Sequence, residues 1–92
     1  MKQAQKMQKD MLDTQNKINE MEFIGESSLV TVKVDGSKKV LEVKIKTDEL
    51  EKDDIEILED MITVATNDAL SKVDEVTQEK MGKYTQGMPG LF

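Results

Sequence analysis

The fold is decided by residues 29–46, which read Leu-Val-Thr-Val-Lys-Val-Asp-Gly-Ser-Lys-Lys-Val-Leu-Glu-Val-Lys-Ile-Lys. Apolar and polar residues alternate on both sides of the Asp35-Gly36 pair, and such a pair favours a turn. A period of two gathers the large apolar groups on one face, so we predict a β-hairpin whose loop, from Asp35 to Lys39, is long enough for a bulge. A lone hairpin is unstable in water, so the flanking segments should cover its apolar face. That face comprises Val30, Val32, Val34, Leu41, Val43 and Ile45.

The segment before the hairpin, residues 1–22, contains neither Gly nor Pro and is predicted to be a helix. Its apolar residues recur at spacings of three and four and form a narrow stripe, which is typical of a helix packed against another helix. We expect that other helix to belong to a second copy of the chain, although an amphipathic helix packed within one chain would show the same stripe. Phe23 and Ile24 should begin a short first strand, and Gly25 permits a bend there. The stripe consists of Ala4, Met7, Met11, Thr14, Ile18 and Met21.

The segment after the hairpin predicts a second, longer helix. Asp53 or Asp54 is expected to cap its start, because Asp53 and Glu56 have the spacing of a capping box. A helix that continues to Gly82 would be roughly 43 Å long at 1.5 Å per residue, which is more than a small sheet can cover. Its second half should therefore project beyond the sheet with a thinner apolar seam. That seam comprises Ala69, Leu70, Val73, Val76 and Met81.

These elements predict an α+β fold of the order α-β-β-β-α, with a small antiparallel sheet and two long flanking helices on one of its faces. Residues 1–92 form a single domain, in which residues 83–92 are an irregular tail with two glycines and a proline. Two seams that are longer than the sheet suggest a homodimer. The residues expected at its interface are Met7, Met11, Ile18, Met21, Val73 and Val76.

The composition excludes most catalytic chemistry. There is no Cys and no His, so thiol chemistry, nucleophilic triads and zinc sites are ruled out. The carboxylates fall on an expected connection and helix surface, where a solvated acidic face is the simpler interpretation. We therefore predict no catalytic residue, no metal, no cofactor and no small-molecule substrate. No apolar run approaches the roughly 20 residues that span a membrane, so we expect a cytoplasmic protein with no membrane partner.

The charge is unevenly distributed along the chain. The net charge is −6, but residues 1–46 carry nine Lys against seven acids, and residues 47–92 carry four Lys against twelve acids. All thirteen basic residues are Lys, and without Arg a direct reading of guanine is not expected. With only three aromatic residues there is no stacking platform for single strands. The lysines therefore either keep the chain soluble or, if nucleic acid binds, contact the backbone of a duplex.

Several short stretches, taken in order, resemble the YbaB/EbfC family of bacterial nucleoid-associated proteins. The match extends over essentially the whole chain. The first stretch, residues 1–11 (MKQAQKMQKDM), is similar to the opening helix of the family, and residues 22–27 (EFIGES) to its first strand. The stretches similar to its last helix and tail are residues 58–61 (LEDM), 67–69 (NDA), 77–82 (TQEKMG) and 87–90 (GMPG).

The resemblance implies a tweezer-shaped homodimer that binds double-stranded DNA with little sequence preference and takes part in nucleoid organisation or gene regulation. It also implies that the first helix and the end of the last helix contact the DNA. In this sequence those positions hold Lys2, Lys6, Lys9, Lys72, Lys80 and Lys83. The alternative is a protein–protein interaction module, in which the projecting helices bind a protein partner.

Overall fold

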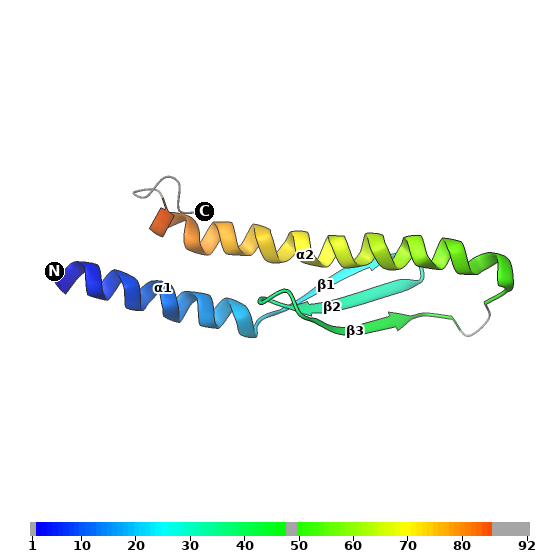
Figure 1. Ribbon diagram of the computed structural model, residues 1–92, viewed down its shortest axis with the longest axis horizontal. Coiled ribbons are helices and arrows are strands. Elements are labelled where there is room, and N and C mark those ends of the chain that lie inside the picture. Colours follow the sequence, from blue (N-terminus) through cyan, green and yellow to red (C-terminus); the bar gives the residue numbers. More distant parts are fainter. Residues whose placement is uncertain (1, 48–49, 86–92) are drawn as a thin grey trace.

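Figure 1 shows the computed structural model of the chain, which describes residues 2–47 and 50–85, with side chains within residues 4–47 and 50–82. The order of elements is helix, three strands, a short 3₁₀ turn and a long helix, as the sequence predicts. Their bounds are α1 Lys2–Glu20, β1 Glu22–Ser27, β2 Val30–Asp35, β3 Val40–Ile45, η1 Lys52–Asp54 and α2 Ile55–Thr85.

The molecule is a long, thin rod. It measures 63 × 22 × 14 Å, and its radius of gyration is 17.7 Å, whereas a compact domain of this length would have about 12 Å. One end of α2 lies on the sheet, and the other end runs beside α1 (Figure 1). The expectation that both helices lie on one face of the sheet is therefore wrong in one respect, because only α2 covers it. The α1 helix extends away from the sheet.

The sheet is antiparallel with the strand order β1-β2-β3, which confirms the predicted hairpin. Phe23 of β1 pairs with Val34, and Val32 of β2 pairs with Val43. The register between β2 and β3 shifts at Lys33 and Val34, so the predicted irregularity near the turn is present. In the turn, the Asp35 carboxylate accepts hydrogen bonds from Ser37 Oγ at 2.6 Å and from the backbone N–H groups of Ser37 and Lys39.

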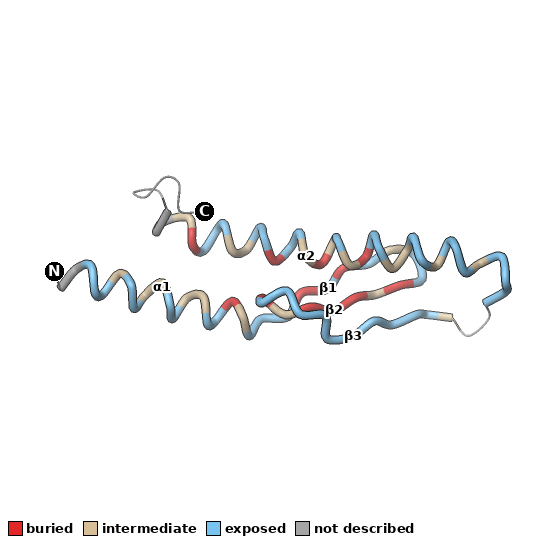
Figure 2. Tube along the Cα trace, in the orientation of Figure 1, coloured by how far each residue is buried: buried red, intermediate tan, exposed pale blue. Residues whose placement is uncertain are grey.

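The core lies between α2 and the first two strands (Figure 2). Val30, Val32 and Val34 are fully buried against α2, because alternation turns all three toward the helix. Gly25 allows β1 to approach α2 closely, since a Cβ at this position would lie 2.0 Å from the Ala65 carbonyl oxygen. The sequence suggested a bend at this glycine, but it lies inside a strand and serves close packing. The remaining buried residues of this core are Phe23, Ala65, Ala69 and Val73.

The third strand is not covered by its own chain. Val43 is 46% exposed although it pairs with the fully buried Val32 on the same face of the sheet. A helix about 10 Å wide covers about two strands spaced about 4.8 Å apart, and α2 lies over β1 and β2. The expectation that flanking segments cover the whole hairpin is therefore wrong for β3. Its exposed apolar residues are Val40, Leu41, Val43 and Ile45, which we call the β3 face.

The long helix α2 begins at Ile55, directly after Asp54 as predicted, and it ends later than predicted. Asp54 Oδ2 accepts a hydrogen bond from the Glu51 N–H at 3.0 Å, so the reciprocal pair is Glu51 with Asp54 rather than Asp53 with Glu56. This pair starts η1, which leads directly into α2. The helix passes through Gly82 and ends at Thr85, so the first residues of the predicted tail are helical. The rest of that tail, residues 86–92, lies outside the described residues.

Candidate nucleic-acid interface

The end of the molecule away from the sheet consists of α1 and the last turns of α2. The two helices meet through one small apolar cluster, in which Ile18 and Met81 are buried and Met7 and Met11 pack at the side. The hairpin turn fixes the base of α1, because the Gly36 N–H donates to the Met21 carbonyl oxygen at 3.1 Å. A Cβ on Gly36 would collide with the Ile18 carbonyl oxygen, at 1.7 Å, so only glycine fits there. The two helices thus run side by side from a fixed base.

The predicted DNA-contacting lysines of α1 lie on this end. Lys6 and Lys9 are exposed on α1, and the ion pairs among the described residues include neither of them. Lys2 lies at the start of α1 and Lys83 near the end of α2, but their side chains are outside the part that the structure describes. An exposed ammonium group without a carboxylate partner can approach a DNA phosphate and release its counterion.

Lys72 and Lys80, both predicted to contact DNA, have different surroundings. Lys80 is exposed near the far end of α2. Lys72 lies beside the sheet, where its Nζ donates to the Ile24 carbonyl oxygen at 2.6 Å and is 3.5 Å from Asp68 Oδ2. Asp68 in turn accepts a hydrogen bond from the Glu26 N–H at 3.2 Å. Together Lys72 and Asp68 bond the outward backbone groups of the edge strand β1, which is a structural role.

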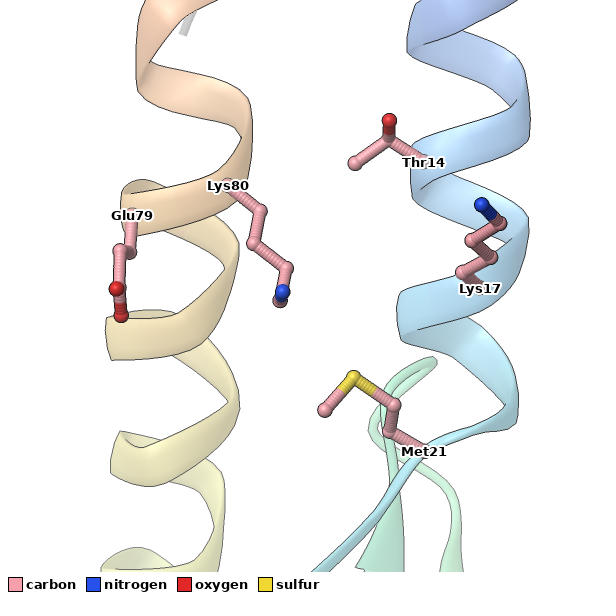
Figure 3. Close-up of a pocket in the computed structure, with 5 residues that line it drawn as sticks. All are labelled: Thr14, Lys17, Met21, Glu79 and Lys80. Atoms are coloured by element: carbon pink, nitrogen blue, oxygen red, sulfur yellow. The ribbon is translucent and has the colours of Figure 1, made fainter.

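Between α1 and α2 lies an open cleft of about 530 Å³. It is lined by Thr14, Lys17, Met21, Glu79 and Lys80, shown in Figure 3. Lys80 extends from α2 toward α1, Thr14 extends from α1 toward α2, and Lys17 lies on α1 between Thr14 and Met21 (Figure 3). Glu79 lies on the side of α2 away from α1. The cleft therefore presents two lysines from helices that are far apart in the sequence.

Lys17 was not among the predicted site residues, although the sequence held a signal for it. Lys17 directly precedes Ile18, and Lys80 directly precedes Met81. Ile18 and Met81 are the buried residues that join the two helices, so the residue before each one falls at the margin of that contact. A pairing of the two seams within one chain would have predicted that Lys17 and Lys80 line one cleft.

The residues predicted for a dimer interface are distributed over this contact and the core. Ile18 and Val73 are buried inside the single chain, and Val76 packs against the sheet core. Met7 and Met11 are half-buried between the helices, and Met21 is 37% exposed at the edge of the cleft. The packing of α1 against α2 within one chain is the alternative interpretation of the narrow apolar stripe.

The described residues contain no arrangement that suggests catalysis or metal binding. Within residues 2–47 and 50–85, no group of three or more acidic side chains is placed to hold a metal ion. No helix in the described part of the chain is long and apolar enough to cross a membrane. What the two-helix end does offer is a set of exposed lysines, whose positive charges can attract anions.

Comparison with known proteins decides the family. The sequence profile of the YbaB/EbfC DNA-binding family matches residues 1–88. The chain belongs to this family. A nucleoid-associated protein of Enterococcus faecalis is 46% identical over 93 residues, which cover 99% of this chain and 89% of that protein. Nucleoid-associated protein OB0030 of Oceanobacillus iheyensis is 46% identical over 96 residues, which cover 100% of this chain and 92% of that protein. The resemblance noted from the sequence is therefore confirmed.

Membership places the chain in a family of DNA-binding proteins rather than enzymes, in agreement with the prediction of no catalytic function. A third relative, a nucleoid-associated protein of Bacillus licheniformis, is 58% identical over 66 residues, which cover 70% of this chain and 62% of that protein. All three relatives are bacterial. The family match extends through both helices and the sheet.

Proposed function

We propose that the chain is a nucleoid-associated protein that binds double-stranded DNA by backbone contacts with little sequence preference, and so takes part in nucleoid organisation or gene regulation. The observation that supports this is a set of exposed lysines on the two-helix end of a YbaB/EbfC chain. The proposed contacts are Lys2, Lys6, Lys9, Lys80 and Lys83, whereas Lys72 is assigned to holding β1. Without Arg, these contacts position the duplex but do not discriminate its bases.

The acidic residues set the conditions under which this binding can occur. The net charge of the chain is −6, and most of the excess acid lies in residues 47–92. The first part of α2, together with η1, carries many of these acids at the sheet end, away from the lysines of α1. Binding therefore depends on local lysines against a repulsive background, and it should weaken steeply as salt rises.

We further propose that the protein is a homodimer joined through the β3 face rather than through the α1 stripe. Four large apolar side chains of β3 are between 38% and 47% exposed, which is costly to leave in water. Leu29, Leu50 and Ile57 extend this surface into a groove beside the start of α2. The opposite edge strand, β1, is already bonded by Asp68 and Lys72 of α2. A second copy that packs on β3 would leave both two-helix ends free for DNA.

DNA binding is tested by fluorescence anisotropy with two duplexes of unrelated sequence at low and moderate salt. We expect similar affinities for both duplexes, and a linear fall of log K with log salt. The proposal would be contradicted if the protein did not bind DNA at low salt, or if its affinity did not change with salt concentration. A stoichiometric protein partner that duplex DNA cannot displace would instead favour the interaction-module alternative.

The dimer is tested by light scattering of the wild type and two single variants. We expect a mass near twice the chain mass of 10.4 kDa for the wild type, and a monomer for Val43→Glu. The control is Ile24→Glu, because Ile24 is 44% exposed, as Val43 is 46%, but it lies on the opposite face of the sheet with Lys33. A monomeric wild type would overturn the dimer, and dissociation by Ile24→Glu alone would move the interface to the other face.

A further inference from the structure

The cleft between α1 and α2 offers a specific place for a phosphate group. Lys17 is exposed on α1 and Lys80 is exposed on α2, and both line the same cleft of about 530 Å³. They are 63 positions apart in the sequence, so only the packing of the helices brings them to one site.

Neither lysine is neutralised by its surroundings. The ion pairs among the described residues involve Lys33, Lys38 and Lys72, and neither Lys17 nor Lys80 takes part in one. The carboxylate that lines the cleft, Glu79, lies on the far side of α2 from α1 (Figure 3). Two ammonium groups that border one hollow repel each other, and an anion between them would remove that repulsion.

The cleft also contains a neutral donor. Thr14 lies on the side of α1 that faces α2, with its methyl group toward α2 and its hydroxyl oxygen pointing along α1 in Figure 3, and a hydroxyl can donate to a phosphate oxygen. The buried pair Ile18 and Met81 sets the spacing of the helices beside the cleft, and the bond from Gly36 to Met21 fixes its base. The donors are therefore carried by two helices whose relative position is already set.

We propose that Lys17 and Lys80 hold one backbone phosphate of the bound duplex between α1 and α2, with the Thr14 hydroxyl as a third donor. The proposal rests on the proposed DNA-binding function, and it names Lys17 as a contact that the family resemblance did not supply. A phosphate held in this way links the two helices, so the DNA reinforces a contact that otherwise depends on the Ile18–Met81 cluster.

The test is NMR titration of ¹⁵N-labelled protein with a short duplex at low salt. In the wild type we expect the amide signals of Thr14, Lys17 and Lys80 to shift together. In Lys17→Gln the shift at Lys80 should shrink, and in Lys80→Gln the shift at Lys17 should shrink, because the two share one ligand. Each variant should bind the duplex about threefold to tenfold more weakly, with a shallower salt dependence.

The matched control is Lys52→Gln, which removes the same charge from η1 at the other end of the molecule and should leave these shifts unchanged. If the wild type binds DNA but the shift at Lys80 persists undiminished in Lys17→Gln, the shared phosphate is overturned while the DNA-binding function stands. If the wild type does not bind at all, the DNA-binding function itself fails. Shifts produced by inorganic phosphate at matched ionic strength but not by the duplex would overturn the assignment to DNA.

Discussion

The two ends of α2 are packed in opposite ways. At the sheet end, small residues let α2 and β1 come so close that a single added carbon at Gly25 would meet backbone atoms of the helix. At the other end, α2 meets α1 through one buried pair, Ile18 and Met81, with an open cleft beside it. The comparison shows how one long helix serves two purposes. Its tightly packed end holds the fold together, and its loosely packed end carries exposed lysines, which we propose contact DNA.

The largest effect is expected from a substitution at the tightly packed end of α2. Gly25→Ala places a Cβ 2.0 Å from the Ala65 carbonyl oxygen, so β1 and α2 must separate. We expect a loss of about 3 kcal/mol in the free energy of unfolding, measured by urea denaturation. The control is Gly82→Ala at the loose end, where an added Cβ meets nothing within 4 Å. That change should stabilise the helix by about 0.5–1 kcal/mol, and equal effects at both sites would contradict the account.

A second pair of substitutions compares a strand that α2 covers with a strand that it leaves exposed. Val32 is fully buried under α2, and its partner Val43 is 46% exposed. Val32→Ala should cost about 2 kcal/mol at every protein concentration, because it leaves a cavity in the chain's own core. Val43→Ala should matter only where dimers form, so its cost should rise with protein concentration. Urea titrations at two concentrations measure both effects, and a large cost for Val43→Ala in dilute monomer would show that β3 is covered by its own chain.

Substitutions of Lys72 and Lys80 in α2 should distinguish a lysine that stabilises the fold from one that binds DNA. Lys72→Gln removes the bond to the Ile24 carbonyl oxygen and the pairing with Asp68, so unfolding should become easier by about 1 kcal/mol. The DNA affinity of Lys72→Gln, and the way this affinity changes with salt, should match those of the wild type. Lys80→Gln should show the reverse, with stability within about 0.5 kcal/mol of the wild type and weaker binding. Loss of affinity without loss of stability in Lys72→Gln would return Lys72 to the DNA-contacting set.

The smallest expected effect concerns the turn that supports α1. The hydrogen bond from the Ser37 hydroxyl, with those from the Lys39 and Ser37 N–H groups, holds the pKa of Asp35 below its ordinary value. The folded protein thus favours the carboxylate, which adds stability above about pH 4, where unfolded Asp is ionised. This contribution is lost as the pH falls through the lowered pKa. Asp35→Asn should therefore show a weaker fall in stability between pH 5 and pH 2, measured by thermal unfolding; an unchanged pH dependence would contradict the assignment.

Much of the fold was predictable because its rules are local. Alternation along residues 29–46 predicted the hairpin, and the absence of Gly and Pro in residues 1–22 predicted the first helix. The start of α2 next to Asp54 was predicted, but the capping pair was not, because several acids follow one another and more than one of them could accept a capping bond. The exposure of Val43 was missed because it depends on the width of a helix relative to three strands, which no local pattern contains.

The candidate site was predictable only in part, because it joins segments that are far apart in the sequence. Spacing and family resemblance pointed to Lys6, Lys9 and Lys80, which are all exposed. They could not distinguish Lys72, whose hydrogen bond to Ile24 depends on where β1 lies against α2. Spacing and resemblance also did not identify Lys17. An apolar stripe indicates that a helix packs against another element, but it does not indicate which element that is. The pairing of Ile18 with Met81 supplies that missing information.

The central claim is that DNA binds at the two-helix end and not at the sheet. The most direct test compares two triple variants of equal charge, Lys6→Gln/Lys9→Gln/Lys80→Gln and Lys39→Gln/Lys44→Gln/Lys46→Gln, by anisotropy with one duplex across a range of salt concentrations. All six lysines are exposed, and each triple removes three positive charges, so a general effect of net charge would weaken both alike. The account predicts that the first triple loses most of its salt-dependent affinity while the second stays near the wild type. Equal losses, or a greater loss in the second triple, would contradict it.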